Sequence, residues 1–498
     1  MVAQPDHSAM TAPSDTTQIF AHRLLAGPDR AAIAYNRRIG IRGGTICDLQ
    51  ECPAEEGAPP LFVMPALANA HDHGRGLSRL AYGALDDALE IWLAGASALH
   101  PPVDPYLLAA AAFARMVRSG VAAAVHCHMP QRSDRLVDEA KAVCRAAGDI
   151  GLPIAFVVPM VDRHRLGYGE DEAILGLLNE SDREVLRARW ARPLPSVQEQ
   201  VAMVGEIARH CESATVNVQF GPYGLEWASD DLLSSVAEAS ARTGRRVHMH
   251  CQETRRQRAW ADTRFPGGFV AHLDALGLLS PRLTLAHCVW LRPEECELLA
   301  ERGVTVALNT SSNLRLGSGV APVAEFVRRG VQLAVGIDAL SLDDDDDALR
   351  ELRLLYRLHR GSSLDPGLSA ADLLRAATVT GFGVVDGSER DGALAPGAPA
   401  DLIAFDWDLL GGDVVSSRTT EIDILLGRAT GGHVASVWSR GREIVRDGRV
   451  TGLDEPAVIA ELHAQAAAGA DAANAFVPAL ERYQAALRRY YGQERHLQ

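Results

Sequence analysis

The sequence predicts an α/β protein built on a (β/α)8, or TIM, barrel, with a small β-sandwich domain made from both chain ends. Between residues 61 and 338, eight short apolar, β-branched runs alternate with segments of helical periodicity. Such alternation implies parallel strands, and eight of them close a barrel. Outside this region both ends of the chain alternate apolar and polar residues around glycine turns, as strands with one buried face do.

The barrel strands are expected at 61–68, 121–128, 153–160, 215–221, 246–251, 283–287, 304–309 and 332–338. Helical segments lie between them. For example, residues 230–244 read DDLLSSVAEASARTG, with Ser229 as the N-cap and Gly244 as the stop. The stretch 162–199 is longer than an ordinary crossover, and we expect it to carry helices of its own over the barrel mouth.

These patterns divide the chain into four parts. We expect residues 15–60 to form the first part of the sandwich, 61–385 the barrel, 386–450 the second part of the sandwich, and 451–498 a helical tail. The tail is predicted from amphipathic patterns such as ALERYQAALRRYY.

Composition restricts the possible partners. The 498 residues carry a formal net charge of −15, no block of basic residues and no apolar run long enough to cross a bilayer. These features argue against nucleic acid and membranes as partners and favour a small diffusible substrate. We expect a cytoplasmic protein that forms a homo-oligomer. The eight cysteines show no CxxC pairs, which argues against a disulfide scaffold or a thiolate zinc site.

Residues of the types that bind metals follow the predicted strands at their carboxyl ends, where a barrel of this kind builds its active site. They are His71, His73, His126, His128, His248, His250, Glu253, His287 and Asp338. Side chains alternate along a strand, so the two histidines of an HxH triplet project to one side. A lone histidine there is more often structural, but convergence of several strands favours a metal site formed by His71, His73, His250 and Asp338.

The motifs also resemble a known family. VMPALANAHDH resembles the PGLxNAHxH opening of the metal-dependent amidohydrolase superfamily, and VHMHCQET, TLAHCVWL, NTSSNLRLGSGVAPV and AVGID are similar to later blocks in the same order. The resemblance spans roughly residues 20–450. Within the superfamily, the chain most resembles the branch that contains the cytosine, guanine and adenosine-type deaminases and the triazine hydrolases. It implies a distorted (β/α)8 barrel beside a small β-sandwich, in agreement with the residue patterns.

The resemblance also implies roles for individual residues. His71, His73, His250 and Asp338 would bind one divalent metal ion, with zinc preferred and iron possible. Glu253 and His287 would be catalytic groups that do not bind the metal, and Asp338 would also accept a proton from water. The predicted fourth strand lacks the lysine that bridges two metals in some members, and the only lysine of the chain, Lys141, lies in a helical segment. The alternative for Glu253 is a surface ion pair with Arg255 or Arg256.

Other positions are more open. We expect His128, Gln219 and Arg75 to contact the substrate, with a structural role as the alternative for His128 and Gln219. His126 and Tyr223 could likewise either contact the substrate or have a structural role. His248 is either directed inward or packed in the core. Arg75, Arg163 and Arg165 would suit a carboxylate on the ligand. The acidic run 343–347 is expected to be a solvated helix start, in preference to a second metal site.

The function expected from these observations is deamination of an amino-substituted nitrogen heterocycle, such as a nucleobase, pterin or triazine, with release of ammonia. One alternative is the opening of a cyclic amide, as in imidazolonepropionase-like enzymes. Another is displacement of an alkylamine, halide or sulfur group. A member of a different class would be an inactive binding protein of the same family, but such proteins typically lose metal ligands, and here the full set is present.

Overall fold

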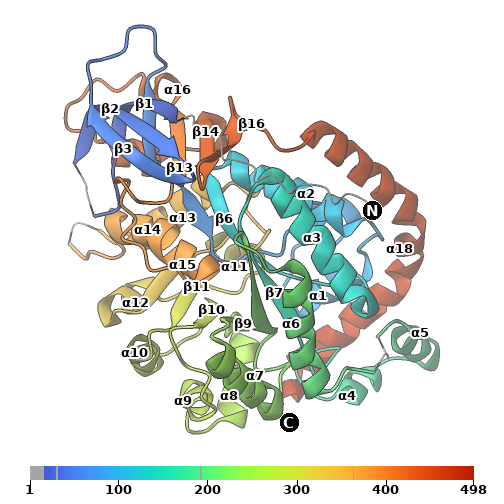
Figure 1. Cartoon of the computed structure of the whole chain (residues 1–498). Coiled ribbons are helices and arrows are strands. Elements are labelled where there is room, and N and C mark those ends of the chain that lie inside the picture. Colours follow the sequence, from blue (N-terminus) through green and yellow to red (C-terminus); the bar gives the residue numbers. More distant parts are fainter. Residues whose placement is uncertain (1–15, 30–31, 191–192, 363) are drawn as a thin grey trace, which may run out of the picture.

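The computed structural model describes residues 16–29, 32–190, 193–362 and 364–498. The expected domain start at residue 15 lies outside these ranges. The described chain forms two sheets, a parallel barrel sheet and a separate mixed sheet, with helices packed around the barrel (Figure 1). No helix among the described residues is both long and apolar enough to cross a membrane.

Neighbouring strands of the barrel sheet are all parallel and follow the order of the chain, from β5 to β12. They are β5 (Leu67–Asn69), β6 (Val121–Cys127), β7 (Ile154–Met160), β8 (Val216–Pro222), β9 (Val247–Cys251), β10 (Leu283–His287), β11 (Thr305–Leu308) and β12 (Gln332–Val335). The first and last strands meet where the amide of Ala70 donates to the Val335 carbonyl at 2.7 Å and the amide of Asp338 donates to the His71 carbonyl at 3.0 Å. These bonds bring the two ends of the sheet together as a barrel, as the sequence predicts.

The second sheet combines strands from both chain ends in the order β16-β15-β14-β13-β4-β1-β2-β3. Its strands are β1 (Thr17–Leu25), β2 (Ile33–Arg42), β3 (Thr45–Glu51), β4 (Leu61–Pro65), β13 (Leu402–Asp406), β14 (Val434–Ser439), β15 (Arg442–Arg446) and β16 (Arg449–Val450). Ile19, Ile39, Leu402 and Trp438 belong to a small apolar core of this sheet, separate from that of the barrel.

The expected first barrel strand, 61–68, is divided between the two sheets, which corrects the sequence prediction. Its first half is β4, which pairs with β13 and β1 in the mixed sheet, and its second half is β5 in the barrel. The change falls at Pro65 and Ala66. The amide of Ala66 donates to the carbonyl of Asp401, which precedes β13 of the mixed sheet. The next amide, that of Leu67, donates to the carbonyl of Gly120, which precedes β6 of the barrel.

Helices alternate with the barrel strands and also cover the barrel mouth. Their bounds are α1 (Leu89–Ala98), α2 (Pro105–Arg118), α3 (Leu136–Ile150), α4 (Asp171–Leu175), α5 (Glu180–Trp190), α6 (Val197–Cys211), α7 (Asp230–Thr243), α8 (Arg255–Arg264), α9 (Phe269–Ala275), α10 (Pro293–Glu301), α11 (Thr310–Arg315), α12 (Val323–Arg329), α13 (Ala348–His359), α14 (Ala370–Arg375), α15 (Gly381–Asp386), α16 (Trp407–Gly411), α17 (Glu421–Arg428) and α18 (Glu455–Gly492). As expected, the excursion after β7 carries its own helices, α4 and α5. The tail helix α18 runs along one side of the barrel and packs on α1, α2 and α5 (Figure 1).

Candidate metal centre and cavity

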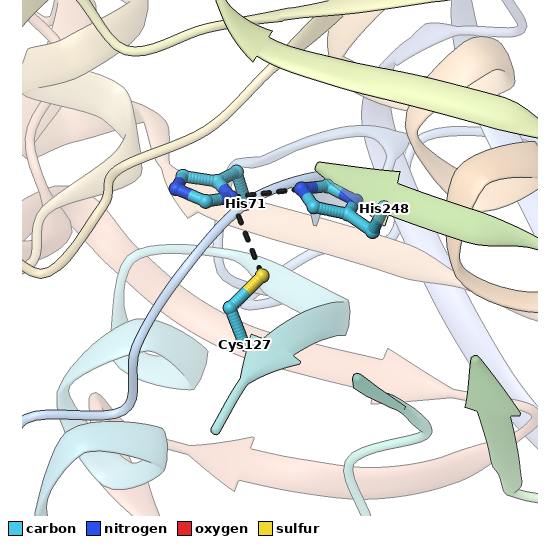
Figure 2. A group of neighbouring side chains, drawn as sticks. All are labelled: His71, Cys127 and His248. Carbon is cyan, nitrogen blue, oxygen red and sulfur yellow. Dashed lines mark hydrogen bonds between the residues drawn. The ribbon is translucent and has the colours of Figure 1, made fainter. Parts of the chain in front are cut away.

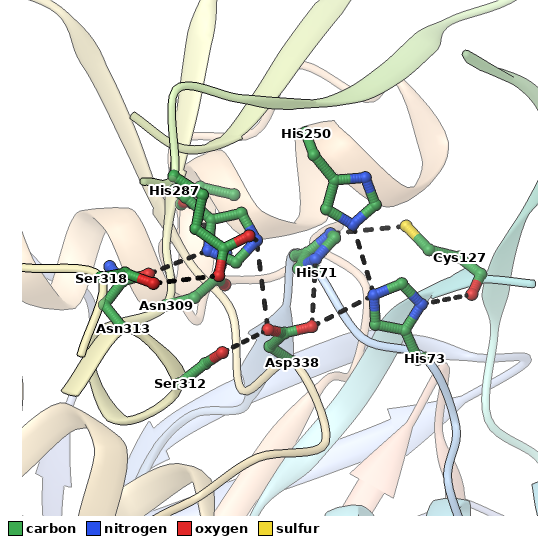
Figure 3. Close-up of polar contacts among 12 residues, drawn as sticks. His71, His73, Cys127, His250, His287, Asn309, Ser312, Asn313, Ser318 and Asp338 are labelled. Atoms are coloured by element: carbon green, nitrogen blue, oxygen red, sulfur yellow. Dashed lines mark hydrogen bonds and ion pairs between the residues drawn. The ribbon is translucent and has the colours of Figure 1, made fainter. Parts of the chain in front are cut away.

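The barrel brings the predicted metal ligands to one place at the carboxyl ends of its strands. His71 and His73 follow β5 directly, His250 lies on β9, and Asp338 follows β12. Figure 3 shows the Asp338 carboxylate directed at His71 and His73, with His250 on the far side of the two rings. The side chains of all four are buried or nearly so. The structure thus brings His71, after the first barrel strand, next to Asp338, after the last one.

Distances within this group are short enough for one shared ion. Asp338 Oδ1 lies 3.3 Å from His71 Nε2 and 3.2 Å from His73 Nε2. His250 Nε2 lies 3.3 Å from His73 Nε2. Ligand atoms of His71, His73 and Asp338 lie within 4.8 Å of one another, and so do those of His71, His250 and His287. Nitrogen and carboxylate oxygen donors at such spacing suit a zinc-type site.

The protonation of these groups also fits a cation. Burial lowers the pKa of His71 and His250 and lowers the pKa of His73 to about 3, so the rings are neutral at physiological pH. Burial alone would raise the pKa of Asp338, but its contacts with His71 and His73 hold the pKa well below its usual range. Neutral imidazoles beside an ionised carboxylate are the state in which these side chains bind a metal.

Contacts on the outer side of each ring orient the ligands. Nδ1 of His73 lies 2.8 Å from the Cys127 carbonyl, and Nδ1 of His250 lies 2.9 Å from the Tyr223 carbonyl. Because a carbonyl only accepts, each Nδ1 carries the proton, and each Nε2 keeps a lone pair for the shared centre.

His71 is oriented by side chains. Its Nδ1 lies 2.8 Å from Nε2 of His248 and 3.4 Å from the thiol sulfur of Cys127, and the rings of His71 and His248 are stacked (Figure 2). His248, for which the sequence left two possibilities, is directed inward and lies on the Nδ1 side of His71. With the proton of His71 on Nδ1, His248 Nε2 accepts it, and Nε2 of His71 faces Asp338.

The turn that carries Asp338 is held in an unusual backbone conformation. Asp338 and Ala339 have φ values of 63° and 50°, in the left-handed region that residues with a Cβ rarely adopt. The carboxylate of Asp72 accepts from the Ala339 amide at 3.1 Å and from the Gly74 amide at 2.6 Å, so it ties this turn to the loop of His71 and His73. Asp72 was not singled out from the sequence, although it stands inside the HDH triplet.

Glu253 and His287 lie beside the metal centre. His287 ends β10, and its Nδ1 lies 2.9 Å from Oδ1 of Asn313, while its Nε2 is 3.6 Å from Glu253 Oε2 and 4.0 Å from Asp338 Oδ2. Glu253 is 3% exposed, and burial raises its pKa to about 7. It forms no ion pair with an arginine among the described residues, whereas Arg256 is 3.5 Å from Glu90. The surface-pair alternative for Glu253 is therefore not what the structure shows.

A cavity of about 1030 Å³ opens beside His73. Its wall includes Arg75 and His128 from the barrel, Arg165 and Trp190 from the excursion after β7, and the face of α18 around Gly469. The excursion therefore reaches the cavity, as we expected for a segment that covers the substrate. The volume is at the upper end of the range for small-molecule sites.

His126 and His128 line this cavity, but their nitrogens are largely used within the protein. His128 Nε2 lies 2.9 Å from Glu139 Oε2, and His128 Nδ1 lies 3.1 Å from His126 Nε2. His128 therefore has no free nitrogen for a substrate, contrary to our expectation. His126 Nδ1 has no partner and packs on Gly74, where an added Cβ would come within 2.4 Å of it, so this position requires glycine.

The structure also corrects the expectation for Gln219. Its side-chain amide donates to the Val384 and Val385 carbonyls of α15 at 2.9 and 3.3 Å, and the residue is fully buried. Helix α15 packs against strands β5 to β8, so Gln219 connects a strand to this helix and does not face the cavity. Tyr223 contributes its backbone carbonyl to His250, as described above. Lys141 lies on the exposed side of α3, away from the metal centre.

The acidic run 343–347 begins α13, but two of its members are not solvated. Asp347 is the N-cap, accepting from the amides of Leu349 and Arg350. Asp346 is buried and accepts from Arg115 Nε at 2.9 Å. Arg115 also donates to the Arg75 and Gly76 carbonyls, so this ion pair anchors the loop after His73. The run is structural, as expected, but part of it is in the interior.

A sequence profile described as the amidohydrolase family matches residues 62–444. The chain is 28% identical over 428 residues to a 5'-deoxyadenosine deaminase of Methanopyrus kandleri, covering 82% of this chain and 88% of the relative. It is 29% identical over 408 residues to a 5-methylthioadenosine/S-adenosylhomocysteine deaminase of Nitratidesulfovibrio vulgaris, covering 80% and 83%.

Solved structures with the same fold include an adenosine deaminase from Xanthomonas campestris with bound zinc, with a TM-score of 0.72, 23% identity and coverage of 90% of this chain and 97% of that one. A zinc complex of atrazine chlorohydrolase from Arthrobacter aurescens gives a TM-score of 0.72 at 21% identity, covering 90% and 98%. Both likenesses show that the barrel and the mixed sheet occur together in other proteins.

Proposed function

Because the chain belongs to the amidohydrolase family, it is a hydrolase, and we propose that it deaminates an amino-substituted nitrogen heterocycle. The overall change is the addition of water and the loss of ammonia, which leaves an oxo group where the amine stood. The observation that carries the proposal is the arrangement of Glu253 and His287 beside the four converging donors His71, His73, His250 and Asp338. The deaminases among the relatives support it.

A zinc ion is the cation that we propose for this centre. When bound, it would act as a Lewis acid that makes water nucleophilic at neutral pH. His71, His73 and His250 would hold it through Nε2, and Asp338 through Oδ1. The donor set of nitrogens and one carboxylate suits zinc, although iron can use the same ligands.

The side chains divide the proton transfers between them. Asp338 is ionised at neutral pH and would accept the proton that the attacking water loses. Glu253 has a pKa of about 7 and is partly protonated at neutral pH, so it can protonate a ring nitrogen and make the adjacent carbon electrophilic. Glu253 would next take up the hydroxyl proton of the adduct and pass it to the leaving amine, which departs as ammonia. The proton held by Asp338 would then restore the acid form of Glu253. His287 donates from Nδ1 to Asn313 Oδ1, so its Nε2, which is buried without a hydrogen-bond partner, can accept a hydrogen bond from the attacking water and orient it.

Ammonia release tests this proposal. Zinc-loaded protein would be incubated with adenosine, 5'-deoxyadenosine, 5'-methylthioadenosine, cytosine, guanine and an aminotriazine, with ammonia measured by a coupled dehydrogenase assay and products by mass spectrometry. We expect one ammonia per oxo product for at least one ring, and loss of the signal in Glu253→Gln. Turnover without ammonia, with chloride release from a chlorotriazine or opening of a cyclic amide, would contradict deamination and favour the corresponding alternative.

A further inference from the structure

Two arginines in the cavity wall have buried guanidinium groups that lack partners. Arg75 and Arg79 follow the HDH triplet and line the cavity beside His73. They are 8% and 4% exposed, and in each of them Nε and Nη1 are buried without a hydrogen-bond partner. Nη2 of Arg75 contacts only the thioether sulfur of Met129, a weak acceptor, at 3.2 Å.

Neither guanidinium forms an ion pair with a carboxylate among the described residues. By contrast, the buried Arg258 pairs with Glu295, and the partly buried Arg115 pairs with Asp346. A buried charge without a partner is strongly unfavourable, so natural proteins rarely keep one without a function. Burial, and next the charge of Arg75, hold the pKa of Arg79 well below its usual range.

Carboxylates farther away do not replace a direct partner. Asp338, Asp72, Asp346 and Glu253 all attract the charge of Arg75. Each of them is already engaged, since Asp338 faces the histidines, Asp72 binds backbone amides, Asp346 binds Arg115, and Glu253 lies beside His287. For Arg79 only Asp338 contributes attraction, and Arg75 opposes it.

The neighbours of the two guanidinium groups are aromatic and uncharged. The Arg75 guanidinium carbon lies 5.2 Å from the ring centroid of Trp92, and that of Arg79 lies 5.4 Å from the ring centroid of Tyr82. His100 lines the same part of the cavity, and burial, followed by the charge of Arg79, lowers its pKa to about 3, so it is neutral. A guanidinium packed on a ring keeps its N–H edges available for an oxyanion.

We propose that Arg75 and Arg79 bind an anionic group, a carboxylate or a phosphate, carried by the substrate on an arm attached to the heterocycle. The inference rests on the proposed function, since the ring at the metal centre sets where the arm begins. The cavity of about 1030 Å³ has room for an arm in addition to a heterocycle. The substrate class is thus an anionic derivative of an amino-heterocycle and not the free base.

Binding of small anions tests the arginine pair without reference to any heterocycle. Thermal unfolding of the zinc-loaded protein would be measured with inorganic phosphate and with glutarate, against chloride at equal ionic strength. We expect at least one of them to raise the unfolding temperature of the wild type, and the shift to be lost in Arg79→Met. Arg79→Met without ligand should be as stable as the wild type or more stable, because a buried unpaired charge is removed.

Paired ligands then show whether the anion belongs to the substrate. Affinities for adenosine against adenosine 5'-monophosphate, and for 5'-methylthioadenosine against S-adenosylhomocysteine, would be measured by calorimetry on zinc-loaded Glu253→Gln protein. We expect the member that carries a phosphate or carboxylate, in at least one pair, to bind about tenfold or more tightly than the member that lacks it. Adding Arg79→Met should abolish that preference. Arg135→Met removes an arginine of the same cavity wall that is already paired with Asp138, and the preference should persist in it.

The outcomes separate the inference from the proposed function. If no ring releases ammonia but phosphate or glutarate stabilises the wild type and not Arg79→Met, deamination fails and the anion site stands. If ammonia is released but neither anion has this effect and no anionic ligand is preferred, the function stands and the anion site is overturned. A loss of stability in unliganded Arg79→Met would also overturn it, since that result would show a structural arginine.

Discussion

The Nε2 atoms of His73 and His250 lie 3.3 Å apart, and Nδ1 of each ring faces a backbone carbonyl. Because the carbonyls fix the protons on Nδ1, two nitrogen lone pairs face each other. Lone pairs at this distance repel unless a cation offsets them, so this relationship supports the proposed cation site. Three predictions concern this centre and the acid beside it.

The first prediction is the metal content of the protein. Wild-type protein should contain about one zinc per chain, and His250→Ala should contain less than about a tenth of that, as measured by plasma mass spectrometry after dialysis. Because metal binds only the folded centre, chelation should also lower the unfolding temperature. His272→Ala is the matched control, since His272 lies on α9 and pairs with Asp230 at the surface. Full zinc content in His250→Ala would contradict the assignment.

The second prediction concerns His248, which we expect to position His71 without binding the metal. Replacing His248 with Leu removes the acceptor for the Nδ1 proton of His71, so the ring loses its orientation. Loss of such an outer contact typically lowers metal affinity about 10- to 100-fold, which competition with a fluorescent chelator would measure. Cys127→Ala removes the weaker contact of 3.4 Å to the same nitrogen and should have a smaller effect. Equal effects of the two variants would show that His248 has no special role.

The third prediction is a pH dependence from Glu253. Burial raises its pKa from 4.5 to about 7, so kcat should fall as pH rises through about 7 and the acid is lost. The free energy of unfolding should also fall as pH rises from about 4.5 to 7. In this range the folded chain holds a proton on Glu253 that the unfolded chain has released. Glu253→Gln should lower kcat about 10²- to 10⁴-fold, remove both pH effects and keep zinc. A kcat profile that is flat from pH 5 to 9 in the wild type would contradict the role.

The sequence was sufficient to predict that the four proposed metal ligands converge, because their positions follow from local rules. Strand alternation places His71 and His73 on one side of their strand. Parallel strands bring their carboxyl ends together, so the same rule adds His250 and Asp338 to the predicted set. Helix α13 was predicted for a similar reason, from an acidic start and helical periodicity.

Contacts between distant segments could not be predicted in this way. Nothing in the run 61–68 shows that its halves join different sheets, since both halves are apolar and buried. His128 looks like a ligand at a strand end, but Glu139, eleven residues later, occupies its nitrogen. Arg79 was overlooked because a sequence rich in arginine does not show which guanidinium lacks a partner.

The fourth prediction concerns the ion pair that holds the loop after His73. Asp346→Asn removes the negative partner of the partly buried Arg115. The cost should lie between about 1 kcal/mol for an exposed pair and about 3–5 kcal/mol for a fully buried one. We expect the midpoint of urea unfolding to fall accordingly. The exposed pair of Arg135 and Asp138 provides the comparison, and Asp138→Asn should cost about 1 kcal/mol or less. A similar small loss in both variants would show that burial adds nothing to the first pair.

The fifth prediction distinguishes a structural Gln219 from the substrate contact that the sequence suggested. Its amide donates to carbonyls near the end of α15, which have no other partner within the helix. Gln219→Leu keeps most of the volume but leaves these buried acceptors unsatisfied, at a cost of about 1–3 kcal/mol. We therefore expect a lower free energy of unfolding in urea, with kcat/KM changed by less than about twofold. A large fall in kcat/KM with unchanged stability would instead place Gln219 in contact with the substrate, because only a residue facing the cavity can affect binding without weakening the connection between β8 and α15.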